Sequence, residues 1–190
     1  KRWKQQFIRL RAAQRTPTHW GIDPNCAVVS LLPRIEPEDM ALVIGAGAAP
    51  MTYLIAAHDA AVTFLAGNLG AVERVESRMA AEALSSLFES YVTSFEPVLP
   101  PFLSFIQNVD LVVLDPGVFL QLDQPLRAEL RPGGIRVLLP SCHSIAPDAL
   151  RPYYGGWSLE EPPRRRRRGA DRKSAPGLIL CKPLCPEDTP

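Results

Sequence analysis

The stretch Met40-Ala41-Leu42-Val43-Ile44-Gly45-Ala46-Gly47-Ala48-Ala49-Pro50 contains the strongest fold signal in the chain. Its first five residues are all apolar, which predicts a buried strand over 40–44. Gly45 and Gly47 then predict a tight turn, and Pro50 suits the first turn of a helix, where a backbone N–H has no partner. Strand, glycine turn and helix in this order are typical of a parallel α/β sheet.

Further strands and helices alternate after this turn. Apolar runs predict buried strands at residues 61–66, 109–114 and 135–139, and helical spacing of apolar residues predicts helices at 51–59, 69–91 and 122–130. A short edge strand around 92–95 is possible, and 157–160 and 177–182 could pair as two more strands. Strands that alternate with helices predict a doubly wound, mostly parallel α/β sheet.

The length of 190 residues fits one domain with a short appendage. Residues 1–36 are predicted to be that appendage, outside the core, because a helix carrying Trp3 and Phe7 is interrupted by Pro17. Residues 37–190 are predicted to form the α/β domain. No apolar run reaches the ~18 residues that a membrane span needs, so a cytoplasmic protein without a membrane anchor is expected.

The charge of the chain is concentrated in one place. The formal net charge is +1, and five positive charges come from one run, so the rest of the chain sums to −4. That run is Arg164, Arg165, Arg166, Arg167 and Arg168, within a predicted loop at 162–175. A basic nucleic-acid-binding body is therefore not indicated. The loop could contact RNA phosphates or an acidic partner, or it could simply be solvated.

The cysteines do not predict a metal site. Cys26, Cys142, Cys181 and Cys185 form no Cys-x-x-Cys pair, and no histidine stands at zinc-ligand spacing. Unpaired thiols are the simpler interpretation, and no metal is expected.

Three segments in register resemble the class I S-adenosylmethionine-dependent methyltransferases. They are residues 41–49, residues 109–115, and Leu130-Arg131-Pro132-Gly133-Gly134 with the strand that follows it. The resemblance implies a seven-strand-type sheet of the Rossmann-like methyltransferase fold, with an antiparallel pair of strands at its carboxyl end. It implies S-adenosylmethionine as cofactor and methyl transfer to a small-molecule or side-chain acceptor that the sequence does not identify.

The resemblance also implies cofactor-binding residues, which are Gly45, Ala46, Gly47, Asn68, Glu96 and Asp115. The chain departs from the family at two positions. Ala66 stands where the family places an acid for the ribose hydroxyls, and Val43 stands where many members carry an acid. An Ala66→Asp change is therefore expected to tighten cofactor binding.

Two residues are candidates for catalysis. His143 follows the strand at 135–139 and could accept a proton from a hydroxyl acceptor; a loop histidine without that role is the alternative. Asp115 begins Asp115-Pro116-Gly117-Val118-Phe119, which partly matches the motif that binds target amines, although a plain turn explains it too. Of the other histidines, His58 is expected near a helix end, and His19 in a leading segment that in this family often covers the substrate.

Two other functional hypotheses stay open. The fold could serve as a catalytically inactive binding or scaffold module that contacts RNA or an acidic partner through the arginine run. A nicotinamide-binding Rossmann domain is less well supported, because Ala66 leaves the ribose without an acid there too and Pro132-Gly133-Gly134 has no role in it.

Overall fold

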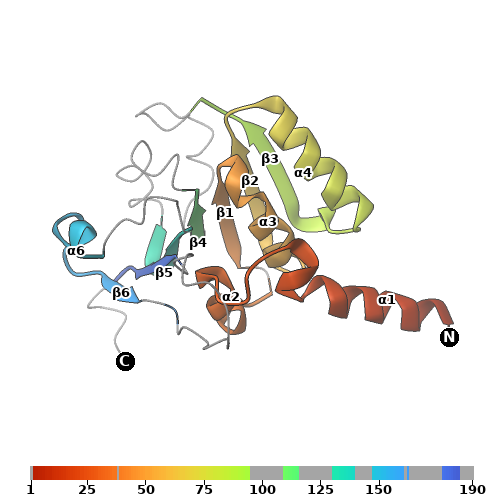
Figure 1. The fold of residues 1–190 in the computed structure, drawn as a ribbon, viewed down its shortest axis with the longest axis horizontal. Helices are drawn as coiled ribbons and strands as arrows, with labels where there is room; N and C mark the ends of the chain where they lie inside the picture. The colour runs from red at the N-terminus through yellow and green to blue at the C-terminus, as the bar shows by residue number, and fades with distance from the viewer. Residues whose placement is uncertain are drawn as a thin grey trace, which may run out of the picture.

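The computed structural model describes residues 2–37, 39–94, 109–115, 130–139, 147–160, 162 and 177–184. These residues form a seven-stranded sheet in the order β3-β2-β1-β4-β5-β7-β6 (Figure 1). The strands are β1 Met40–Ile44, β2 Ala61–Ala66, β3 Phe88–Val92, β4 Val109–Leu114, β5 Leu130–Leu138, β6 Ser158–Glu160 and β7 Leu178–Cys181. The first five strands pair in parallel, and β7 is antiparallel to both β5 and β6. The predicted doubly wound sheet with an antiparallel terminal pair is confirmed.

The helices of the described residues are α1 Arg2–Gln14, α2 Ala27–Leu31, α3 Ala49–Ala56, α4 Leu69–Ala81 and α6 Pro147–Leu150. Short 3-10 turns accompany them at Pro17–Trp20, Leu32–Arg34, Ala46–Ala48, Ser85–Leu87 and Arg151–Tyr153. No helix in these ranges has both the length and the apolar character needed to cross a membrane.

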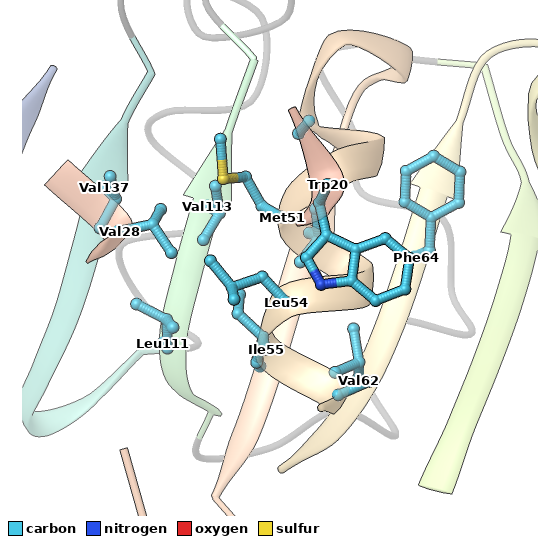
Figure 2. Close-up of a cluster of buried hydrophobic side chains, with 14 of the residues drawn as sticks. Trp20, Val28, Met51, Leu54, Ile55, Val62, Phe64, Leu111, Val113 and Val137 are labelled. Carbon is cyan, nitrogen blue, oxygen red and sulfur yellow. The ribbon is translucent and has the colours of Figure 1, made fainter. Parts of the chain in front are cut away.

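Each face of the sheet has its own core. On one face α2, α3 and α4 cover the strands, and Figure 2 shows this cluster around Leu54, Phe64 and Val113. On the other face Leu150 and Tyr154 belong to a second cluster that also includes Ile44, Leu65 and their neighbours. Successive residues of a strand point to opposite faces, so strands buried on both sides must be apolar throughout. This requirement explains the apolar run of β1 and the apolar run 111–114 within β4.

Two predicted element boundaries are wrong. The helix predicted over 69–91 ends at Ala81, where Ala83 takes a left-handed φ of 54° and the Leu84 N–H donates to the Met79 carbonyl at 2.9 Å. The edge strand expected at 92–95 is instead β3, Phe88–Val92, paired with β2. Leu87 and Tyr91 continued the helical spacing although Tyr91 lies on a strand.

The fifth strand is longer than predicted, because β5 begins at Leu130 and includes the Pro132-Gly133-Gly134 segment. Its pairing with β4 shifts register between Val109 and Leu111, which accommodates that segment. The helix predicted at 122–130 lies outside the described residues except for Leu130, which belongs to this strand.

The leading segment divides into two parts. Helix α1 is exposed except near its end, whereas Trp20, Ile22, Val28 and Leu31 are buried in the first core. The expectation that nothing before residue 37 belongs to the core is therefore wrong for the residues from Trp20 to Leu31. The domain boundary at residue 36 stays a prediction.

Candidate functional site

The glycine turn lies at the carboxyl end of β1, in the middle of the parallel strands. Gly45 has a φ of 99° and donates its N–H to the Leu65 carbonyl at 2.9 Å. The Ala48 N–H donates back to the Gly45 carbonyl at 3.0 Å, which closes a 3-10 turn before α3 begins. The chain therefore turns sharply from β1 into α3, and Ala46 and Gly47 are exposed at the carboxyl ends of the parallel strands.

Asp115 brings the end of β4 against this turn. Its N–H donates to the Ile44 carbonyl at 2.9 Å, and its Oδ2 accepts from the Gly47 N–H at 2.8 Å. A Cβ atom built on Gly45 would lie 2.4 Å from the Asp115 Cβ, and one built on Gly47 would lie 2.4 Å from Oδ2. The turn therefore needs glycine at both positions for Asp115 to pack there, whether or not a ligand binds.

Asn68 follows β2 and begins α4. Its Oδ1 accepts from the Ala71 N–H at 2.8 Å, so the side chain is the N-cap of the helix. A carbonyl oxygen has two lone pairs, so this cap is compatible with accepting a ribose hydroxyl as well. Asn68 is exposed at the sheet edge that carries the glycine turn.

The two positions that depart from the family pattern are both buried. Ala66 and Val43 are fully buried within the first core cluster. A carboxylate at position 66 would have to be accommodated among apolar side chains at the carboxyl end of β2, which costs stability unless the charge is paired. The expectation that Ala66→Asp tightens cofactor binding stays a prediction.

Several candidates fall outside the residues that the structure describes. They are Glu96, His143, residues 116–119, Arg164 to Arg168, and the thiols of Cys142 and Cys185. Their proposed roles stay predictions. Of the predicted cofactor residues, the structure describes Gly45, Ala46, Gly47, Asn68 and Asp115, and all of them lie at the carboxyl ends of β1, β2 and β4.

The two described histidines lie away from the glycine turn. His19 Nε2 is 3.8 Å from Glu82 Oε2, just after α4 ends, and its ring meets Trp20 edge to face. His58 lies two residues after the end of α3 at Ala56. Helices α3 and α4 begin beside Gly47 and Asn68, at the carboxyl ends of β1 and β2. Both histidines lie near the C-terminal ends of these helices, away from that site. The implied placement of His19 over a substrate is not found.

His58 is half-buried, and burial together with the nearby Arg15 guanidinium lowers its pKa. Its Nε2 is buried and has no hydrogen-bond partner among the described residues. These features disfavour the charged imidazolium, because burial removes part of its hydration and the Arg15 guanidinium repels it more strongly than Asp59 attracts it.

No metal centre is found in the described part of the chain, where no three His, Cys, Asp or Glu side chains gather. Cys26 is a buried free thiol whose pKa is raised mainly by burial, and Cys181 is a half-buried free thiol.

Sequence analysis missed one buried charge, Arg136 on β5. Its side chain is fully buried, donates to the Tyr154 hydroxyl at 2.9 Å, and lies 5.9 Å and 5.8 Å from the ring centres of Tyr154 and Trp157. The signal was available, because an arginine within the apolar run 135–139 must face either a partner or solvent. Arg136 packs on the second face of the sheet. It lies on β5, which is separated by β4 from the strand that carries the glycine turn.

Several solved structures with a similar fold are methyltransferases by name. An O-methyltransferase dependent on S-adenosylmethionine, from Thermotoga maritima, has a TM-score of 0.63 at 11% identity, covering 88% of this chain and 68% of its own. A precorrin-6y C5,15-methyltransferase from Geobacter metallireducens has a TM-score of 0.59 at 14% identity, covering 82% and 87%. An rRNA methylase from Streptococcus thermophilus has a TM-score of 0.56 at 15% identity, covering 82% and 93%.

No family model matches the chain, and no curated protein matches it either. The likeness to solved structures therefore establishes the fold, and the chain has the class I methyltransferase fold. The resemblance that the three sequence segments indicated is confirmed at this level.

Proposed function

We propose that this protein is an S-adenosylmethionine-dependent methyltransferase acting on a small molecule or a side chain. One observation carries the proposal: the glycine turn after β1 lies against the acid that ends β4, at the carboxyl edge of a sheet with methyltransferase strand order. In open α/β sheets ligands bind at that edge, where the strand order reverses. The methyltransferase names of the structural neighbours support the same class of reaction.

The residues at this edge fit the amino-acid end of the cofactor. Asp115 offers a carboxylate to an ammonium group, and the exposed Ala46 and Gly47 let a ligand approach the backbone. Asn68 would accept from a ribose hydroxyl, with no acid beside it, and Glu96 is proposed for the adenine end. When bound, the cofactor supplies a methyl group on a positively charged sulfur, which makes that carbon electrophilic.

The chain's own groups would then handle the acceptor. His143 is proposed as the base that takes a proton from an acceptor hydroxyl, since histidine can do so near neutral pH. The run Arg164 to Arg168 is proposed as the contact for a polyanionic acceptor or partner, for which the rRNA methylase among the neighbours is a precedent. A cytoplasmic location stays a prediction.

The test is a calorimetric titration of the full chain with S-adenosylmethionine and with S-adenosylhomocysteine. It is repeated with Asp115→Asn, which keeps the acceptor for the Gly47 N–H but removes the negative charge. A hydrogen bond to a charged group is worth roughly 1 kcal/mol more than a neutral one, so about fivefold weaker binding of both ligands is expected.

Asp110→Asn is the matched control. Asp110 lies at the other end of β4, where it accepts from the Met40 N–H at 2.7 Å and pairs with Arg131. The control changes the net charge equally and should leave affinity unchanged. Equal affinity in all three proteins would remove Asp115 from the site. If the parent binds neither ligand, the enzyme proposal fails and the non-catalytic module becomes the better hypothesis.

A further inference from the structure

Helix α1 carries an apolar seam that is largely uncovered by the rest of the molecule. The helix runs away from the sheet (Figure 1), and Trp3, Phe7 and Leu10 are 75%, 42% and 42% exposed. These residues and Gln14 are spaced by four, three and four positions, the spacing of the contact positions in a two-stranded coiled coil. The four therefore lie on one narrow stripe of the helix.

The inner end of the seam is fixed to the domain. Gln14 is fully buried, and its Nε2 donates to the Glu82 carbonyl and to Glu82 Oε2 at 2.9 and 3.0 Å. Arg11 donates to the Ala83 carbonyl at 3.2 Å. The last turn of α1 is thus held at the end of α4, and no element of the described residues covers the seam beyond that point.

The exposed end of the seam is already ordered by its own contacts. The Trp3 and Phe7 rings stack with centroids 5.9 Å apart, and the Arg11 guanidinium lies 5.5 Å from the centre of the Phe7 ring. A partner that covers these rings would meet an arranged surface, so less side-chain entropy would be lost on binding.

The charge beside the seam has one sign. The helix carries Arg2, Lys4, Arg9 and Arg11 and no acidic residue, and the first acid in the chain is Asp23. Charges flanking a coiled-coil seam choose the partner, because opposite charges attract and like charges repel. We propose that α1 is a docking helix for an acidic amphipathic α-helix of a partner protein.

Other occupants fit the helix less well. A second copy would bring basic flanks against basic flanks, with no acid on either helix to pair them. A membrane surface calls for a broad apolar face, whereas this stripe is narrow and the exposed Ile8 lies on the opposite side among cations. RNA would stack bases on open rings, whereas Trp3 and Phe7 stack on each other.

The test uses two labelled helical peptides of three heptads, with leucine at the two contact positions of each heptad. One has glutamate at the flanking positions, which also keeps it from pairing with itself, and the other has lysine there. Fluorescence anisotropy should show the acidic peptide binding the full chain, with affinity that falls as salt rises, and the lysine peptide not binding.

Variants of α1 then locate the contact. Trp3→Ala and the double change Trp3→Ala/Phe7→Ala should each weaken acidic-peptide binding, the double by about tenfold or more, as loss of aromatic anchors does at interfaces. Ile8→Ala is the matched control, an exposed apolar residue of the same helix on another face, and should bind as the parent does. Circular dichroism of each variant checks that α1 stays helical. If the double variant has lost helix, the comparison rests on the single variant Trp3→Ala.

Four outcomes would overturn the proposal. The first is that the acidic peptide does not bind, and the second is that the lysine peptide binds as tightly as the acidic one. The third is that Ile8→Ala weakens binding as much as Trp3→Ala does. The fourth is that Trp3 is needed for binding single-stranded oligouridylate, phosphatidylserine vesicles or a second copy of the chain, and not for binding the peptide. The variants should titrate with S-adenosylmethionine as the parent does, so failure here and failure of the methyltransferase proposal are distinguishable.

Discussion

At the scale of single residues, the contact between Asp115 and the glycine turn decides what can stand at positions 45 and 47. Gly45 is doubly constrained, because its φ is positive and an added Cβ would lie 2.4 Å from the Asp115 Cβ. Gly47 is constrained only by the carboxylate end of the same side chain, which can rotate away. Of the two positions, Gly45 should therefore be the more costly to change.

Gly45→Ala should lower the free energy of unfolding by at least about 2 kcal/mol, since such backbone strain costs on the order of 1–3 kcal/mol before the clash is counted. Denaturant unfolding followed by circular dichroism measures the loss. Gly155→Ala is the control, because nothing lies within 4 Å of a Cβ there and no positive φ is involved. Gly47→Ala should fall between the two. A Gly45→Ala variant as stable as Gly155→Ala would contradict the close packing of Asp115.

His58 should make the fold less stable in mild acid. Its pKa is lowered in the folded state, so between that lowered value and the ordinary value near 6.5 the unfolded chain binds more protons. Stability therefore falls as pH drops below about 6.5 and is recovered as pH rises through this window. Thermal unfolding at pH 7.5 and 5.5 should show a smaller difference for His58→Gln than for the parent. An equal difference in the two proteins would assign the acid sensitivity to other groups.

At the scale of elements, helix α4 is defined by its two caps. Asn68 begins it through a side-chain hydrogen bond, and Ala83 ends it in a left-handed conformation. The Leu84 N–H to Met79 carbonyl bond completes the usual closing motif, in which glycine is the preferred residue at the left-handed position.

Ala83→Gly should therefore stabilise the protein by about 0.5 kcal/mol. The change removes roughly 1 kcal/mol of backbone strain, which is more than the cost of the extra freedom that glycine gives the unfolded chain. Ala80→Gly is the control inside the same helix and should destabilise by about 0.5–1 kcal/mol. Chemical denaturation of both variants gives the comparison. If both changes destabilise equally, the left-handed cap at Ala83 is not a source of strain.

The strands differ in how well the sequence predicts them. β1, β2 and β4 are largely buried and their residues are apolar except for Thr63 and Asp110, so each strand has recognisable ends. β3 is an edge strand that exposes Glu89 and Tyr91, and no apolar run marks it. The end of α4 was missed because it depends on a backbone conformation at Ala83 that no residue type there announces.

The candidate site was predictable only in part, for the same reason. Both glycines and Asp115 are recognisable as strand-ending residues, but their contact depends on β1 and β4 being neighbours in the sheet. The burial of Ala66 was not predictable, because Leu65 and Ala66 are both buried, on opposite faces, and the sequence does not say which way each points.

At the scale of the whole molecule, the leading segment connects the helices of one face. Trp20 donates its indole N–H to the Gln14 carbonyl at 2.6 Å, packs on Tyr53 with ring centroids 5.0 Å apart, and lies under the Arg78 guanidinium. Arg15 donates to the Ala57 carbonyl at 2.9 Å and pairs with Asp59. The segment thus joins α1, α3 and α4 through these contacts.

Two tryptophans in the leading segment test this integration. Trp20 is 9% exposed within the first core and Trp3 is 75% exposed on α1, so the same substitution removes very different amounts of packing. Trp20→Ala should lower the free energy of unfolding by about 3–5 kcal/mol, the usual cost of truncating a large buried aromatic side chain. Trp3→Ala should change it by no more than about 0.5 kcal/mol, as exposed positions do. Equilibrium urea unfolding of both variants, followed by far-UV circular dichroism, measures the difference. Equal and small effects would show that the residues before 37 are an appendage after all, and that the domain is stable on its own from residue 37 onward.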